Sequence, residues 1–311
     1  MTNPKRSLWI DTHMHVTDIG ANGKWRKHML EGVLNMLEES GADLRIILSC
    51  DKPYTHGMKH APEQILAGNR MVYDLIRQAP DKLYGSCMIN PNFLEESLKV
   101  MKICFEEWGF VQLGEMLQYT MDYRMNSNAG EKVVKLAARY NAPVQIHLGS
   151  YWFQGIGESG AGMEQMEDLL GIAERVPEAK YILGHAIGCG PTSEYIPWGN
   201  WFLDVLNGVF LSYPDNFWVE IMNFSHSELL KRVLKEVPTN RLLVGTDWST
   251  RIGPPFQPYG EVFRFKEDRN KIDTHADISS IKKMLLRAGS SRDMISQITY
   301  KNAMELYNIR I

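Results

Sequence analysis

Residues 8–15 of the chain read LWIDTHMH, three apolar residues followed by polar ones that end in two histidines. His13 and His15 stand two positions apart, and side chains at this spacing on a strand point to the same face. Both imidazoles can therefore face one point, and their nitrogens suit zinc and similar divalent ions. A His-x-His pair alone is a weak signal. Here the pair directly follows Asp11 and Thr12 at the end of an apolar run, and this combination predicts a metal site at a strand end.

Four more polar residues of this kind stand where other apolar runs end: Glu115, His147, His185 and Asp247. Each has an ordinary alternative explanation, since a lone histidine at a strand end is more often a hydrogen-bonded core residue. A lone glutamate such as Glu115 is more often solvated. Asp247 ends an apolar run, where a buried carboxylate without a partner would be unfavourable, so it is expected to have a partner. A parallel barrel gathers its strand ends into one ring, so we expect these side chains to converge on a single pocket.

Short apolar runs alternate with longer segments of helical period along the chain. The runs predicted as strands are residues 7–10, 45–50, 82–89, 110–113, 143–146, 180–183, 217–222 and 241–245. The segments predicted as helices are residues 29–40, 62–79, 94–108, 130–140, 163–176, 227–237 and 278–288. This alternation is typical of an α/β protein with a parallel sheet, and eight such units predict a (β/α)8 TIM barrel. Without a linker or internal repeat, residues 1–311 are predicted to form a single domain.

The least regular stretches are rich in proline and glycine. Residues 190–215 contain three prolines and three glycines, and we expect a broken helical excursion there. Residues 251–260 follow the last predicted strand, where such loops usually form lids or pocket walls. Residues 291–309 are predicted to form a closing helix, and Asn92 is predicted to cap the helix that follows it. Asn141 and Gly289 follow helical segments, where a left-handed residue is tolerated.

Composition limits the partners and the compartment. The 311 residues include 34 basic and 37 acidic ones, a formal net charge of −3, which gives no sign of a nucleic acid or anionic membrane partner. The apolar run at residues 8–10 is too short for a signal peptide or a spanning helix, so we expect a soluble, cytoplasmic protein. Cys50 and Cys87 lie in strand-like segments and are predicted to be small core residues.

At this point the sequence resembles a known family. The motifs Asp-Thr-His13-Met-His15, Gln-Ile-His147, Gly-His185 and Gly-Thr-Asp247 are similar to those of the amidohydrolase superfamily. More narrowly they resemble its amidohydrolase-related (amidohydrolase 2) branch of metal-dependent TIM-barrel hydrolases. The pattern extends from the first strand to the last. Residues 301–303, Lys-Asn-Ala, are also typical.

The resemblance implies a role for each matching residue. His13, His15 and Asp247 would hold the principal metal, with His147 as a further ligand. His185 would lie beside the substrate or bind a second metal. Glu115 stands where some relatives have a carbamylated lysine or a glutamate that bridges two metals. We expect one well-occupied divalent ion, zinc by preference, and leave a second site open.

Such a site would support hydrolysis of an amide, ester or lactone of a small molecule. Asp247 would take the proton of the attacking water, and His185 would stabilise the developing oxyanion. Two alternatives remain open: metal-dependent, non-oxidative decarboxylation of a small carboxylic acid, and a non-catalytic binding barrel. The residues Gly114-Glu115 favour hydrolysis because they resemble the fourth-strand motif of hydrolytic relatives.

Residues after the predicted strands are candidates for the substrate pocket. Tyr151 and Trp248 could form apolar walls, and Arg124 or Arg251 could clamp a substrate carboxylate through two parallel hydrogen bonds. Each also has an ordinary role as a packing anchor or a surface ion pair. Nothing in the sequence identifies an interface, so homo-oligomer formation is left open.

Overall fold

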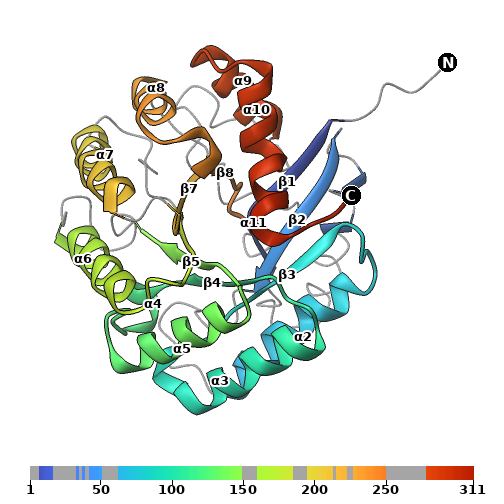
Figure 1. Cartoon of the computed structure of the whole chain (residues 1–311). Helices are drawn as coiled ribbons and strands as arrows, with labels where there is room; N and C mark the ends of the chain where they lie inside the picture. Colours follow the sequence, from blue (N-terminus) through green and yellow to red (C-terminus); the bar gives the residue numbers. More distant parts are fainter. Residues whose placement is uncertain are drawn as a thin grey trace.

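The computed structural model describes residues 7–16, 33–34, 37–38, 42–50, 62–148, 160–184, 195–212, 215–222, 227–249 and 278–311. Eight parallel strands form a nearly closed barrel, with helices on its outside (Figure 1). The strands are β1 Leu8–Val16, β2 Asp43–Cys50, β3 Leu83–Cys87, β4 Gln112–Met116, β5 Val144–His147, β6 Tyr181–Gly184, β7 Phe217–Ile221 and β8 Leu242–Val244. Strands that are consecutive in sequence are neighbours in the sheet. The predicted (β/α)8 TIM barrel is confirmed.

A short extra strand helps to close the ring. β9, Trp248–Ser249, follows β8 and pairs in parallel with β1, where Met14 is opposite Trp248 and His15 is opposite Ser249. The backbone N–H of Asp247 also donates to the carbonyl oxygen of His13 at 2.9 Å. The last barrel strand is therefore continued by a segment that is hydrogen-bonded directly to the first.

The described helices are α2 Glu63–Ile76, α3 Leu94–Lys102, α4 Gln118–Met121, α5 Asn128–Arg139, α6 Gly160–Arg175, α7 Tyr195–Ser212, α8 Ser227–Glu236, α9 Ile278–Arg287, α10 Arg292–Ser296 and α11 Asn302–Tyr307. None of them combines the length and apolar character needed to cross a bilayer. Ser127 caps α5 by accepting a hydrogen bond from the N–H of Gly130 at 3.1 Å. Asn141 and Gly289 have positive φ angles of 54° and 92°, as predicted for residues that follow helices.

The core has two parts. The larger lies between the strands and the surrounding helices and includes Cys50 and Cys87, which are fully buried as predicted. The smaller joins strand residues such as Ile10 and Trp218 to α11, through Leu306 and other residues of that helix. Ile10 and Trp218 lie near the starts of their strands, so α11 packs against the amino-terminal end of the barrel.

Two local predictions were wrong. The expected break within residues 190–215 is absent from α7, which runs continuously from Tyr195 to Ser212. Pro197 lies in its first turn, where a missing N–H removes no intrahelical hydrogen bond. Asn92 does not cap α3: it lies inside the 3-10 segment Pro91–Phe93, and Phe93 occupies the N-cap position of the helix. Asn90 precedes that segment with extended backbone, and its side chain accepts from the N–H of Asn92 at 3.0 Å.

Candidate metal centre

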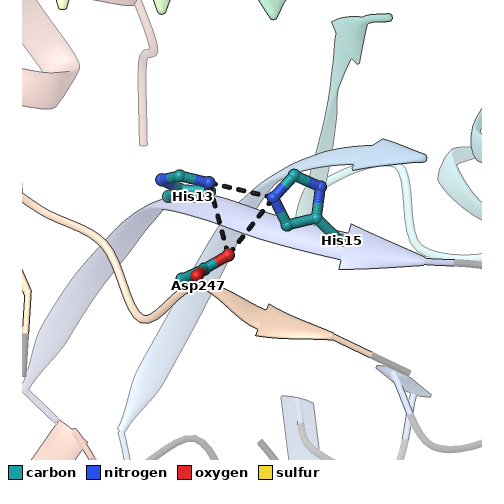
Figure 2. Close-up of side chains that lie close together, drawn as sticks. All are labelled: His13, His15 and Asp247. Atoms are coloured by element: carbon teal, nitrogen blue, oxygen red, sulfur yellow. Dashed lines mark hydrogen bonds and ion pairs between the residues drawn. The ribbon is translucent and has the colours of Figure 1, made fainter. Parts of the chain in front are cut away.

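Three side chains from the two ends of the barrel sequence meet at one point. Figure 2 shows His13, His15 and Asp247 turned toward one another. The Nε2 atoms of the two histidines lie 2.9 Å apart. Asp247 Oδ1 lies 3.5 Å from His13 Nε2 and 3.3 Å from His15 Nε2. Among the residues that the structure describes, this is the one group of three or more His, Cys, Asp or Glu side chains close enough to share an ion.

The backbone explains this convergence. β1 runs through to Val16, so His13 and His15 lie within the strand and share one of its faces. Asp247 lies between β8 and β9 with a φ of 49°, a left-handed conformation that is uncommon for a residue other than glycine. Its backbone bond to His13 holds this turn against β1. The first strand of the barrel therefore supplies the two histidines, and the turn after the last strand supplies Asp247.

Each histidine is held from behind by a hydrogen-bond acceptor. His13 Nδ1 lies 2.7 Å from Glu220 Oε2, and His15 Nδ1 lies 2.7 Å from Ser49 Oγ. A carboxylate only accepts, so His13 donates to Glu220. The Ser49 hydroxyl donates to the carbonyl oxygen of Met14 at 3.3 Å, so it accepts from His15. Each ring therefore has its Nδ1–H engaged, and the two Nε2 atoms point at the same place.

This arrangement fits a divalent cation. Two nitrogen lone pairs that face each other at 2.9 Å repel unless a proton or a metal ion lies between them, and a divalent ion can replace that proton. Ligand atoms about 2.1 Å from one ion, at octahedral to tetrahedral angles, lie about 3.0–3.4 Å apart. The observed separations of 2.9, 3.3 and 3.5 Å are close to that range. The nitrogen and carboxylate donors suit zinc or manganese.

Glu115 extends the group toward β5. Its Oε2 lies 3.4 Å from His13 Nε2 and 3.5 Å from His15 Nε2, while its Oε1 lies 2.7 Å from His147 Nδ1. His147 is thus joined to the group through Glu115. Gly114 permits this placement, since a Cβ there would lie 2.5 Å from the carbonyl oxygen of Gln145 on β5.

Burial and charge shift the acid–base behaviour of the cluster. Burial alone disfavours the charged form of His13, but the carboxylates of Glu220 and Glu115 outweigh it and raise the pKa of His13 well above its usual value. Burial likewise disfavours ionised Glu115, but His13 and His147 outweigh it and hold the pKa of Glu115 well below its usual value. Burial raises the pKa of Asp11 to about 7, against the hydrogen bonds that it accepts from Thr246 and the His13 N–H. The cluster concentrates negative charge around two imidazoles, which favours a bound cation.

The other predicted site residues have different outcomes. His185, Tyr151 and Arg251 lie outside the described residues, and so does the side chain of Trp248. Arg124 forms a two-pronged ion pair with Asp168 of α6, with Nε to Oδ2 at 2.7 Å and a second N–H to Oδ1 at 2.8 Å. The substrate-binding roles of these residues stay predictions.

The residues behind the histidines were not predicted from the sequence. Glu220 is fully buried in the apolar strand Phe217–Ile221, and Gln145 is buried in Val144–His147. A charged or amide residue inside such a short apolar strand was a usable signal. Ser49 carried no such signal, because a serine at a strand end is common.

Comparisons with known proteins identify the family and support the fold. The family model described as Amidohydrolase matches residues 10–309. A search of curated proteins found no match. Among solved structures, the chain resembles a 2,6-dihydroxybenzoate decarboxylase from Rhizobium, with 14% identity, a TM-score of 0.65 and coverage of 97% of this chain and 99% of that chain.

Two further solved structures resemble it equally well. A dihydroxybenzoic acid decarboxylase from Polaromonas sp. JS666, with bound manganese and an inhibitor, has 15% identity and a TM-score of 0.66 over 98% of both chains. A 4-oxalomesaconate hydratase from Rhodopseudomonas palustris has 15% identity and a TM-score of 0.66, covering 97% of this chain and 96% of that chain. At these identities the structures establish the fold alone. Because the family model covers nearly the whole chain, the protein belongs to the amidohydrolase family.

Proposed function

We propose that this protein is a metal-dependent hydrolase that cleaves an amide, ester or lactone of a small molecule. The observation that carries the proposal is the convergence of His13 Nε2, His15 Nε2 and Asp247 Oδ1 within 3.5 Å of one another. A divalent ion held by these atoms supplies Lewis acidity for a carbonyl and lowers the pKa of a water molecule toward about 7. We propose zinc as this ion and one well-occupied site.

Asp247 is the proposed proton carrier. It is 7% exposed and lies beside both imidazoles, so its carboxylate can accept a proton from attacking water and deliver it to the leaving group. His185 is proposed to stabilise the oxyanion that develops on the substrate. The imidazoles of His13 and His15 would stay in place during this transfer, because their Nδ1 atoms are held by Glu220 and Ser49.

Glu115 supports the hydrolytic reading. Its two oxygens face different histidines, with Oε2 toward His13 and His15 and Oε1 toward His147. One carboxylate therefore connects the proposed metal centre to His147 on β5. A second ion would need His147, and we propose that it is bound more weakly than the first.

Non-oxidative decarboxylation is the second candidate. The observation in its favour is that solved structures with this fold include decarboxylases of dihydroxybenzoic acid, one of them with manganese. In that reaction the site would hold the carboxylate or hydroxyl oxygens of the substrate, and Asp247 would deliver a proton to carbon.

One assay separates the candidates. Protein purified without chelator is analysed for metal and then tested on lactones, esters, N-acyl compounds and aromatic carboxylic acids, with CO2 detection throughout. Hydrolysis with about one equivalent of zinc supports the proposal, whereas CO2 release alone replaces it with decarboxylation. A double variant, His13→Ala with His15→Ala, is the metal-free control. Bound metal without turnover on any class would favour a binding barrel.

A further inference from the structure

Glu220 is a fully buried carboxylate with three donors around its two oxygens. Oε2 accepts from His13 Nδ1 at 2.7 Å. Oε1 accepts from the Thr12 hydroxyl at 2.6 Å and from Gln145 Nε2 at 3.0 Å. A buried carboxylate with this many donors is held in one orientation.

The hydrogen bonds continue from Glu220 across the barrel interior. Gln145 Oε1 accepts from Gln112 Nε2 at 2.9 Å, and Gln112 Oε1 accepts from the hydroxyl of Tyr307 in α11. Gln112, Gln145 and Tyr307 are all at least 93% buried. A buried series of hydrogen bonds, the hydrogen-bond chain, therefore joins α11 on the amino-terminal side of the barrel to His13, a proposed metal ligand on the other side.

The direction of every bond in this chain is the same. Tyr307 donates to Gln112, Gln112 donates to Gln145, and Gln145 donates to Glu220. Ser86 fixes the amide of Gln112, because its hydroxyl donates to the Gly114 carbonyl at 2.6 Å and accepts from Gln112 Nε2 at 3.1 Å. Each donor points toward Glu220, so the polarity of the chain stabilises negative charge at that carboxylate.

The absence of a side chain at Gly245 also leaves room for the Glu220–His13 pair. A Cβ on Gly245 would lie 2.6 Å from Glu220 Oε1 and 2.6 Å from the Cβ of His13. Contacts this short do not occur between real side chains, so only glycine at this position leaves the pair undisturbed. The end of β8 is thus shaped around the contact between β7 and β1.

We infer that Glu220 is a positioning residue for the metal centre, and that Gln145, Gln112 and Tyr307 extend this positioning to α11. Glu220 holds the proton of His13 on Nδ1, keeps Nε2 available and makes the imidazole a stronger donor to a cation. The inference rests on the proposed metal centre and adds a residue that acts through His13 without touching the ion or the substrate.

Metal affinity and the imidazole N–H signals of the zinc-loaded protein test this inference. Glu220→Gln should weaken zinc binding by about 10- to 100-fold, measured by competition with a chelator. The low-field proton signal of His13 Nδ1–H should shift or disappear in this variant. The signal of His15 should stay, since Ser49 holds that ring, and it is the internal control.

A second pair of variants tests the far end of this series of hydrogen bonds, at Tyr307. Tyr307→Phe removes the terminal donor and should weaken zinc binding, by a smaller factor than Glu220→Gln. Tyr181→Phe is the matched control, because Tyr181 is also buried and its hydroxyl donates to the Val176 carbonyl at 3.0 Å, outside this series of hydrogen bonds. It should leave zinc affinity unchanged.

The outcomes are distinguishable. If the native protein binds no zinc or manganese, the proposed metal centre fails and the inference fails with it. If the native protein binds zinc while both Glu220→Gln and Tyr307→Phe bind it as tightly, the inference alone is overturned. Should Glu220→Gln not fold, the native spectrum still decides, because coordination of His13 through Nδ1 contradicts the assigned role.

Discussion

At the scale of single residues, the two histidines of the centre are not equivalent. His13 is backed by a carboxylate, Glu220, whereas His15 is backed by the hydroxyl of Ser49. A charged acceptor makes a stronger hydrogen bond and a more basic imidazole than a neutral one. His13 Nε2 should therefore bind a metal ion more strongly than His15 Nε2.

Replacement of Ser49 by alanine removes the acceptor behind His15. The ring is then free to place its proton on Nε2, so zinc affinity should fall by up to about tenfold, less than for Glu220→Gln. Ser97→Ala is the control. It deletes a buried hydroxyl that lies away from the site and donates to the Asn90 carbonyl oxygen at 2.7 Å. Titration with zinc by calorimetry measures both. Equal loss in the two variants would argue for a general stability effect.

Replacement of Asp247 by asparagine tests the proposed proton carrier. An amide cannot shuttle a proton at neutral pH, so the turnover number should fall by about 10²- to 10⁴-fold. The metal content of each preparation is measured first, because Asp247 also lies beside both Nε2 atoms. Full activity in a metal-loaded variant would mean that another group carries the proton.

At the scale of secondary structure, the site depends on close approach between neighbouring strands. Gly114 lets β4 pass near β5, and Gly245 leaves room at the end of β8 for side chains of β7 and β1. At the other end of the strands, Asp43 at the start of β2 is paired with Lys82, which precedes β3. Contacts at both ends therefore hold neighbouring strands together.

Gly245→Ala should lower both stability and zinc affinity, because the new methyl group displaces Glu220 or His13. Overpacking of this kind costs about 1–3 kcal/mol. Gly208→Ala in α7 is the matched control: a Cβ there meets no atom within 4 Å, and alanine favours the helix by about 1 kcal/mol. Denaturant titration of the two variants should give shifts of opposite sign. A neutral Gly245→Ala would mean that the strand ends adjust freely.

The ion pairs at Asp43 predict a pH-dependent contribution to stability. The hydrogen bond from Lys82 and the one from Arg45 lower the pKa of Asp43 below its ordinary value of 3.8. A carboxyl group with a lowered folded-state pKa stabilises the fold above about pH 4, and this is lost as pH falls through the folded pKa. Asp43→Asn should therefore cost about 0.5 kcal/mol at pH 7, because the pair is partly exposed. The deficit, followed in urea titrations, should shrink as the pH is lowered below about 4; a constant deficit would assign it to packing.

At the scale of the whole molecule, the proposed centre joins distant parts of the chain. Its side chains come from β1, β4 and the turn after β8, and Glu220 adds β7. An ion bound to the folded protein and not to the unfolded chain would stabilise all of these elements together.

Metal should therefore raise the thermal midpoint. At an ion concentration 100 times the dissociation constant, the gain is about 2.7 kcal/mol, a shift of several degrees for a chain of this size. Scanning fluorimetry with zinc, and then with excess chelator, measures it. The His13→Ala, His15→Ala variant should show no shift. An equal shift in that variant would point to binding elsewhere.

The sequence alone determined the barrel and the three residues that meet at its end. Strand and helix periods repeat locally, and parallel strand ends converge for topological reasons, so His13, His15 and Asp247 could be predicted to lie together. The continuity of α7 escaped prediction, because Pro197 lies in the first turn, where proline is tolerated, and the sequence did not show where the helix begins. Only the tertiary structure revealed Glu220, Gln145 and Ser49 behind the histidines. These contacts join residues up to 207 positions apart, and which buried polar side chains face each other depends on strand register and on the room left by glycines.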